Sequence, residues 1–332
     1  MVLNSSPLSK RVKSIAHWRN GHPVNMDSTA LSGRIILSGA SGMLGSALQR
    51  ALATRGIPTL QLMRRGPAAA GQLQWNPGEE RIIESPAPVE GAVAAIHLSG
   101  ASVASHRWTD AYKREMAASR VESTHKLAKV LAALRTPPKT FVVASAIGIY
   151  GDRGDEVLTE SSQAGSGFLA NLCRHWEAAA EPAVQAGIRV VHTRFGVVLG
   201  PGHGALQQML PPFRLGLGAR LGSGRQWMSW VSLADVIAAI LFALEQTKLA
   251  GPVNVTAPNP VTNAEFTRAL GQQLHRPALL TVPAFAVRTL FGQMGDEALL
   301  ASARVQPEKL QASGFRFSMP ELNRALRAAL EN

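Results

Sequence analysis

Three glycines spaced three residues apart carry the clearest chemical signal in the sequence. Gly39, Gly42 and Gly45 follow a short apolar run, residues 35–38, and precede an amphipathic segment, residues 46–53. This order predicts a strand, a phosphate-binding loop and a helix. The first glycine would permit a tight turn, the second would let the backbone approach a pyrophosphate, and the third would let the helix pack against its strand. The alternative is a structural turn that binds nothing.

The N–H groups at the start of such a helix attract negative charge, so the loop predicts a dinucleotide site. The further loop residues expected to contact the cofactor are Ser41, Met43 and Leu44.

Two arginines, Arg64 and Arg65, follow the second apolar run, residues 58–63. An NAD-binding unit usually has an acidic residue near this position to hold the ribose 2′-hydroxyl. Guanidinium groups suit a phosphate instead, so the pair predicts NADP rather than NAD. The alternative is a pair of surface arginines.

Candidates for acid/base chemistry are Ser145, Tyr150 and Glu177. Ser145 follows a buried apolar run and could hydrogen-bond a substrate carbonyl or the nicotinamide amide, or simply cap a loop. Tyr150 could donate a proton or be a packed aromatic. Glu177 would be a proton-transfer group if it were desolvated in a cleft, whereas an exposed helical glutamate is the commoner case.

From Arg34 onward, apolar strands alternate with helical patterns, which predicts an α/β fold with a mostly parallel sheet covered on both faces. Loops at the carboxyl ends of such strands line the ligand crevice. The strand ends expected at the cofactor are Leu98, Ser99, Gly100, Ser145 and Arg194.

The domain organisation follows from the same pattern. Residues 1–32 lack periodicity and are expected to be a disordered leader, with Met26 as an alternative start and a weak likeness to a transit peptide. Residues 33–200 with a returning segment, 230–258, form the predicted cofactor domain. Residues 201–229 and 259–332 form a smaller C-terminal α+β lobe, in which Gln226, Trp227 and Trp230 are the predicted substrate wall. Core packing is the alternative for the tryptophans.

Four local features carry further expectations. Residues 110–134 are predicted to form one long helix and residues 72–84 a small hairpin. His97 is expected to be a core histidine with its hydrogen bonds satisfied rather than a catalyst, and Cys173 is expected to be buried and inert.

Composition excludes several classes of function. No apolar run reaches the roughly 18 residues that a membrane helix needs, and no signal peptide is evident. One cysteine among 332 residues fits a reducing, cytoplasmic setting. The nine histidines show no metal-ligand spacing. The chain has a net charge of +12, but its lysines and arginines do not alternate with aromatic residues as they would in a base-stacking surface. The charge therefore predicts a solvated basic surface around an anionic cofactor rather than a specific nucleic-acid site.

Several motifs together resemble the extended type of short-chain dehydrogenase/reductase, and more closely its atypical branch of sugar-nucleotide-epimerase-like proteins, often labelled cell-division-inhibitor homologues. The motifs are the glycine loop, Leu98-Ser99-Gly100, Arg107-Trp108-Thr109 with Lys113 and Ser119-Arg120, Ser145-Ala146-x-Gly148-x-Tyr150-Gly151, Phe168-Leu169-Ala170 through Trp176-Glu177, residues 222–230 and Ala257-Pro258-Asn259-Pro260. The resemblance covers about residues 33–330. It implies a Rossmann-type doubly wound parallel sheet that binds NADP, with a smaller substrate lobe.

The sequence departs from that family at the catalytic positions. Ordinary members use a Ser, a Tyr and a Lys four residues later, where the Lys lowers the pKa of the Tyr. Here Ala146 stands in the Ser position. The Tyr and Lys positions hold Phe168 and Leu172, or Leu169 and Cys173 in the next register. The Arg-Asp pair of nucleotide-sugar enzymes is replaced by Met228-Ser229, which puts a nucleotide-sugar substrate in doubt.

Three hypotheses follow. The chain is an NADP-dependent epimerase-like oxidoreductase or isomerase that acts on a small polar or sugar-like substrate through a non-standard acid/base group. Alternatively, it is a catalytically silent NADP-binding regulatory or interaction protein, or a nucleic-acid-associated protein. We expect a monomer or homodimer with no membrane partner and no metal.

Overall fold

The computed structural model describes residues 33–64, 69–202 and 204–331. Its centre is a seven-stranded sheet in the order β12-β7-β5-β4-β1-β2-β3, in which every neighbouring pair is parallel. The strands are β1 (Ile35–Ser38), β2 (Thr59–Met63), β3 (Gln72–Gln74), β4 (Ala94–His97), β5 (Thr140–Ala146), β7 (Arg189–Phe195) and β12 (Gly251–Val255).

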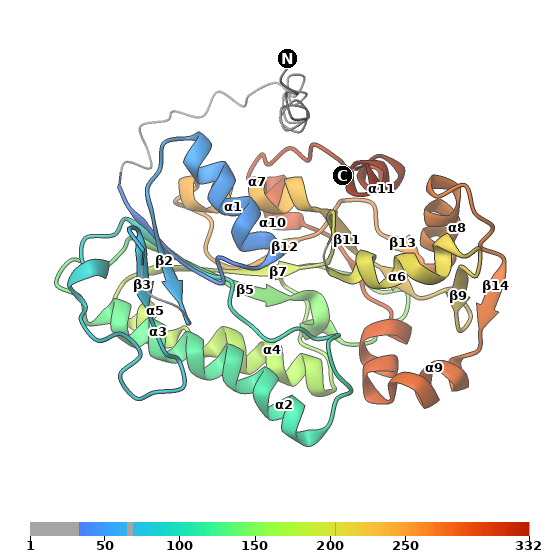
Figure 1. Cartoon of the computed structure of the whole chain (residues 1–332), viewed down its shortest axis with the longest axis horizontal. Helices are drawn as coiled ribbons and strands as arrows, with labels where there is room; N and C mark the ends of the chain where they lie inside the picture. Colours follow the sequence, from blue (N-terminus) through green and yellow to red (C-terminus); the bar gives the residue numbers. More distant parts are fainter. Residues whose placement is uncertain (1–32, 65–68, 203, 332) are drawn as a thin grey trace, which may run out of the picture. The chain divides into compact units, whose positions relative to one another are not determined.

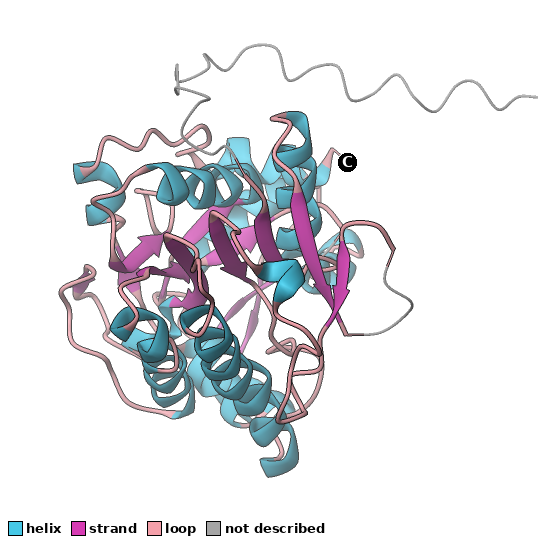
Figure 2. Cartoon of the chain, turned by 90° about the vertical axis from the view of Figure 1, so that its left-hand side faces the viewer, coloured by secondary structure: helices cyan, strands magenta, loops and turns pink. Residues whose placement is uncertain are grey.

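Helices cover both faces of this sheet, as the doubly wound prediction requires (Figures 1 and 2). On one face lie α1 (Met43–Thr54), α7 (Leu233–Glu245) and α10 (Glu308–Ala312). On the other lie α2 (Asp110–Ala117), α3 (Ser123–Ala132), α4 (Phe168–Ala178) and α5 (Glu181–Gln185), with the short helical turns η1 (Ala87–Val89) and η3 (Ile147–Tyr150) in the connections. The central strands are apolar on both faces because both are covered; β1, for example, is buried at every residue.

The smaller lobe has a hydrophobic core of its own, centred on Phe213, Trp230, Phe266 and Leu326. Its helices are α6 (Gly204–Arg214), α8 (Asn263–Gln273), α9 (Ala284–Phe291), η4 (Gly295–Leu300) and α11 (Leu322–Leu330). Its short strands, and those that join it to the sheet domain, are β6 (Val157–Leu158), β8 (Val197–Leu199), β9 (Ala219–Leu221), β10 (Trp227–Met228), β11 (Trp230–Ser232), β13 (Val261–Thr262), β14 (Leu280–Val282) and β15 (Arg304–Val305). The domain boundaries drawn from the sequence stay a prediction.

One local expectation was wrong, and a second was right in outline but not in detail. Residues 72–84 form no hairpin, because Gln72–Gln74 pair in parallel with Gln61–Met63 and extend the sheet at its edge. The expected helix over 110–134 is helical but not one α-helix: a π-helical turn, η2 (Ala118–Glu122), separates α2 from α3. A π-turn accommodates an extra residue and is common at functional sites.

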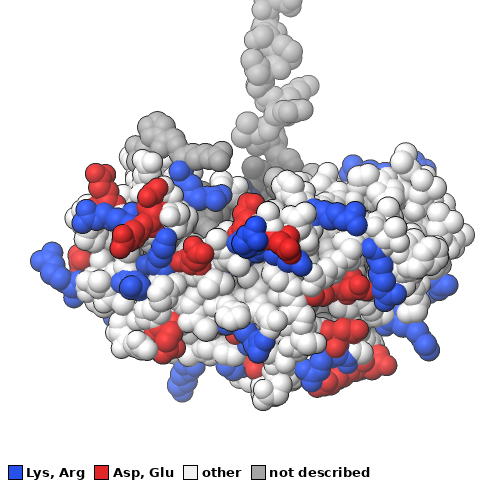
Figure 3. All heavy atoms as spheres, turned by 90° about the horizontal axis from the view of Figure 1, so that it is seen from below, with Lys and Arg blue, Asp and Glu red and all other residues white. Residues whose placement is uncertain are grey.

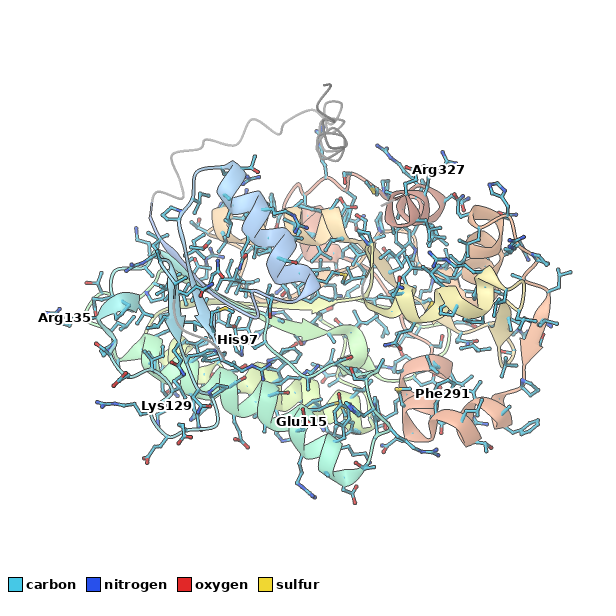
Figure 4. The ribbon with its side chains drawn as sticks, viewed as in Figure 1. His97, Glu115, Lys129, Arg135, Phe291 and Arg327 are labelled. Carbon is cyan, nitrogen blue, oxygen red and sulfur yellow. The ribbon has the colours of Figure 1, made fainter. Side chains whose placement is uncertain are left out.

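The expectation for His97 is confirmed. It is fully buried in β4, where its Nδ1 lies 2.6 Å from Ser38 Oγ and its Nε2 lies 3.1 Å from Ser123 Oγ. Figure 4 shows His97 inside the molecule, whereas Lys129 and Arg135 lie at the periphery. Burial lowers the pKa of His97 to about 3, so the imidazole is neutral.

Candidate cofactor site and its buried polar network

The glycine loop connects β1 to α1, and its three glycines meet different surroundings. Gly39 has a φ of +73°, and a Cβ there would lie 2.7 Å from the carbonyl carbon of Leu98. A Cβ on Gly45 would lie 2.1 Å from the oxygen of Gly39, so the helix and the loop pack too closely for any side chain. Gly42 is exposed, and a Cβ there would have one neighbour, the oxygen of Gly39, at 3.4 Å. The space beside Gly42 is therefore open to a ligand.

Helix α1 begins without a capping side chain and without an acidic residue in its first turn. Its first N–H groups therefore keep the partial positive charge of a helix N-terminus. Ser41 is exposed, and Met43 and Leu44 are partly exposed. A bare helix start beside an open glycine fits a phosphate group.

The remaining predicted contacts follow neighbouring strands. Leu98 and Ser99 come directly after β4, next to the glycine loop, since Gly39 approaches the Leu98 carbonyl. Arg64 follows β2, is exposed, and has no ion-pair partner among the residues that the structure describes. Arg65 lies outside the described residues.

Ser145, Glu177 and Arg194 come together in one buried network. Ser145 on β5 pairs in register with Arg194 on β7, and Glu177 reaches both from α4. Ser145 Oγ donates to Glu177 Oε1 at 2.7 Å. Arg194 donates from Nε to Glu177 Oε1 and from Nη2 to Glu177 Oε2, each at 2.8 Å.

The bidentate ion pair keeps both Glu177 and Arg194 in their charged forms. Burial alone would raise the pKa of Glu177, but the hydrogen bonds and charge of Arg194, with the Ser145 hydroxyl, outweigh burial and hold that pKa below its usual range. Burial opposes the charge of Arg194 too, yet Glu177 raises the pKa of Arg194. At neutral pH both groups are therefore charged.

Tyr150 completes the network on the other side of Arg194. It is 0% exposed, and its hydroxyl accepts from Arg194 Nη1 at 2.9 Å while lying 2.7 Å from Asn254 Oδ1 and 2.9 Å from the Thr159 carbonyl. Burial raises the pKa of Tyr150, although Arg194 opposes the rise. The phenol is neutral and enclosed, an arrangement that favours the packed-aromatic alternative.

The face of α4 next to this network carries no standard acid/base pair. In the register of Leu169 and Cys173, Leu169 lies against Gly148, whose added Cβ would be 3.3 Å from Leu169 Cβ. Cys173 is 3% exposed, which confirms its expected burial, and burial raises its pKa to about 12, so the thiol stays protonated at neutral pH.

The predicted substrate wall is largely internal. Trp230 is 0% exposed in the lobe's core, with its indole N–H donated to the Asn259 carbonyl. Gln226 is buried, and its amide nitrogen donates to the carbonyls of Leu221 and Leu299. Trp227 is partly exposed, donates to Asp155 Oδ1 at 2.8 Å and stacks under Arg304.

Sequence reasoning missed Glu297. Its carboxylate accepts the N–H groups of Phe168 (3.0 Å) and Leu169 (2.8 Å), so a residue of the C-terminal lobe caps helix α4. Gly167, with a φ of +103°, passes so close to this carboxylate that a Cβ would lie 2.9 Å from its carbon. The sequence signal for this contact was Gly167, which precedes α4 and has no side chain of its own to cap the helix.

No group of three His, Cys, Asp or Glu residues that could hold a metal occurs in the described part of the chain. Among the same residues, no helix combines the length and apolar character needed to cross a membrane. On the face shown in Figure 3, basic side chains are scattered among acidic ones rather than gathered into one patch.

Comparisons with known proteins agree with this geometry. Residues 35–256 match the NAD dependent epimerase/dehydratase family, and residues 282–329 match a domain of unknown function, DUF1731. Epimerase family protein Mb2239 of Mycobacterium bovis is 44% identical over 292 residues, which cover 88% of this chain and 96% of that protein. Epimerase family protein SDR39U1 of Homo sapiens is 35% identical over 298 residues, covering 89% of this chain and 98% of that protein.

The crystal structure of the human protein SDR39U1 (isoform 2) was solved with NADPH. It matches 90% of this chain and 99% of its own, with a TM-score of 0.81 and 35% identity. That protein holds the cofactor which the sequence predicts for this chain. The resemblance inferred from the motifs is confirmed, and the chain belongs to the NAD-dependent epimerase/dehydratase family.

Proposed function

We propose that this chain binds NADP(H) at the carboxyl ends of β1, β2, β4 and β5. The open space at Gly42, beside a helix start that no side chain caps, is the observation that carries this proposal. The pyrophosphate would lie against Gly42 and the N–H groups of Met43 and Leu44. Arg64, with Arg65, would hold the 2′-phosphate. The NADPH in the structure of the related human protein supports the same cofactor here.

We further propose that the chain is an epimerase-like oxidoreductase or isomerase for a small polar or sugar-like substrate. NADP(H), when bound, supplies hydride transfer. Ser145 lies at the end of β5, and its hydroxyl donates to Glu177, so the Ser145 oxygen keeps lone pairs that can accept a hydrogen bond from a substrate hydroxyl and orient it toward the nicotinamide. Glu177 and Arg194 hold that hydroxyl in one orientation, and Tyr150 supports Arg194 from the other side. In this proposal Ser145 is the catalytic residue, whereas Glu177, Arg194 and Tyr150 position it.

Binding without turnover is the second candidate function. Tyr150 is fully enclosed, the carboxylate of Glu177 is held by Arg194, and neither register of α4 supplies a Tyr and a Lys. These features support a catalytically silent NADP-binding regulatory or interaction protein.

A turnover panel separates the two. The purified chain is incubated with NADPH and a panel of aldehydes, ketones and keto sugars, and with NADP⁺ and the matching alcohols and sugars, while absorbance is followed at 340 nm. Chromatographic separation of the sugar isomers detects an epimerase that returns its hydride and therefore leaves the absorbance unchanged. If the chain is an enzyme, it shows activity that Ser145→Ala reduces about a hundredfold without abolishing cofactor binding. Tight NADPH binding with neither signal across the panel supports the silent protein, and unchanged activity in Ser145→Ala removes Ser145 from the chemistry.

A further inference from the structure

Helix α4 has no cation at the Lys position of either register, but a cation from the neighbouring π-helical turn lies over the ring of Trp176 on the same helix. Arg120 belongs to the π-helical turn η2 and is 8% exposed. Its charge acts on the thiol of Cys173, where it opposes the rise in pKa that burial causes. Cys173 is the residue that stands for the Lys in one of the two registers of α4.

Arg120 has no acidic partner among the residues that the structure describes. Its Nη2 donates to the carbonyl of Ala101 at 2.7 Å and its Nη1 to the carbonyl of Met116 at 3.3 Å. Its guanidinium lies over the ring of Trp176, 5.1 Å from the centroid. A buried guanidinium that meets only carbonyls and a ring keeps its charge uncompensated, which is costly unless a ligand completes the site.

The same π-turn also holds the loop after β4 through hydrogen bonds to Ala101. Ala101 donates its N–H to Ser119 Oγ at 3.0 Å and accepts from Arg120 through its carbonyl. A Cβ on the exposed Gly100 would lie 3.1 Å from Arg120 Cζ, so the guanidinium lies directly against this loop. The π-turn is tied to the sheet in turn, because Ser123 Oγ contacts both the Ser119 carbonyl (2.7 Å) and His97 (3.1 Å).

The position of this loop in the sheet indicates which half of the dinucleotide lies beside it. In a doubly wound sheet, the two halves of the sheet each hold one mononucleotide, on either side of the point where the strand order reverses. Here β1, β2 and β3 form one half, which carries the glycine loop and Arg64, and β4, β5 and β7 form the other. The loop after β4 therefore belongs to the nicotinamide half.

We propose that Arg120 supplies, from η2, the positive charge at the nicotinamide half of the cofactor site that a Lys on α4 would otherwise supply. Its guanidinium both holds the loop at Gly100 and Ala101 and donates to hydroxyl or phosphate oxygens of the nicotinamide ribose moiety. This inference rests on the proposed binding of NADP(H).

The test compares two ligands in titrations of the full chain. NADPH occupies both halves of the site, whereas adenosine 2′,5′-bisphosphate represents the adenosine half alone. Arg120→Met should weaken NADPH binding about tenfold or more, in the range expected for a charge-assisted hydrogen bond, and leave the bisphosphate within about twofold. Arg120→Lys, which keeps the charge, should restore part of the loss. Arg114→Met, an exposed arginine on α2, is the matched control and should bind both ligands as the wild type does.

Gly100→Ala gives a second route if Arg120→Met fails to fold. Its Cβ would lie 3.1 Å from Arg120 Cζ and push the guanidinium away from the loop by a few tenths of an ångström, so this variant should also bind NADPH more weakly and keep the bisphosphate. Unchanged NADPH affinity in Arg120→Met or Gly100→Ala would overturn the inference, as would an equal loss of both ligands. A wild-type chain that binds neither ligand would instead contradict the proposed function.

Discussion

Glu177 and Arg194 form a bidentate ion pair between α4 and β7, with side chains only 13% and 8% exposed. The pair joins the helix that carries no standard acid/base group to the strand end beside Ser145. Its charges are compensated by each other and by hydrogen bonds from Ser145 and to Tyr150. We therefore interpret this ion pair as the contact that holds α4 against the ends of β5 and β7, at the nicotinamide half of the site.

Removing one member of this pair should be far more damaging than removing an exposed pair. Glu177→Ala leaves Arg194 buried without a counter-charge, and we expect a loss of about 3–5 kcal/mol in the free energy of unfolding. Asp296→Ala, which breaks the exposed pair with Arg288, should cost at most about 1 kcal/mol. Urea unfolding measures both. An equal loss in the free energy of unfolding for the two variants would contradict this structural role of the Glu177–Arg194 pair.

Two glycines of the loop should respond differently to the same change. Gly45→Ala forces a Cβ to within 2.1 Å of the Gly39 oxygen, so it should lower the unfolding temperature clearly. Gly42→Ala should fold normally, because its Cβ has room, but it should weaken NADPH binding by filling the space beside the helix start. Thermal unfolding and cofactor titration of both variants test this. Normal NADPH affinity in a folded Gly42→Ala would show that the pyrophosphate lies elsewhere.

Burial of His97 predicts a pH dependence of stability. The unfolded chain protonates this imidazole below pH ~6.5, whereas the folded chain, with the pKa lowered to about 3, does not. The unfolded state therefore binds the extra proton between these values, and stability falls by about 1.4 kcal/mol for each unit of decreasing pH. His97→Gln, which can still meet Ser38 and Ser123, should show a shallower decline between pH 6 and 4 in urea unfolding. The exposed His125→Gln should follow the wild type, and parallel profiles for all three would contradict this account.

Much of the sheet could be predicted because its signals are local. The glycine loop, the apolar strands and the buried His97 all depend on residues within a few positions of one another. The edge strand β3 was missed because its parallel pairing with β2 depends on a neighbour across a connection, not on a turn signal. The π-turn was missed because a single extra residue hardly changes helical periodicity.

The site was predicted less completely, since its contacts come from distant segments. The contact of Arg194 with the cofactor stays a prediction. Its hydrogen bonds to Glu177 and Tyr150 were missed, because only the packing of α4 and η3 against β7 brings these residues together. Trp230 lies in the core because α8 and α11 cover it. Glu297 reaches α4 across more than a hundred residues of sequence, and no local pattern could indicate that.

The Glu297 cap gives a further prediction about how the C-terminal lobe supports α4. Glu297→Ala removes the acceptor of two helix N–H groups and should cost about 1–2 kcal/mol, with Glu297→Gln intermediate because it loses the charge but keeps an acceptor. The exposed Glu308→Ala, in the first turn of α10, is the control. Chemical denaturation measures all three. A Glu297→Ala variant as stable as the control would mean that the cap contributes nothing.

The central claim is that the glycine loop and the arginines after β2 form an NADP(H) site. Titration of the wild-type chain and of Arg64→Ala/Arg65→Ala with NADPH and with NADH tests it most directly. The wild type should prefer NADPH, and the double variant should lose about tenfold or more in NADPH affinity while NADH binding changes little. Equal affinity of the wild type for both cofactors, or an unchanged preference in the double variant, would contradict the assignment.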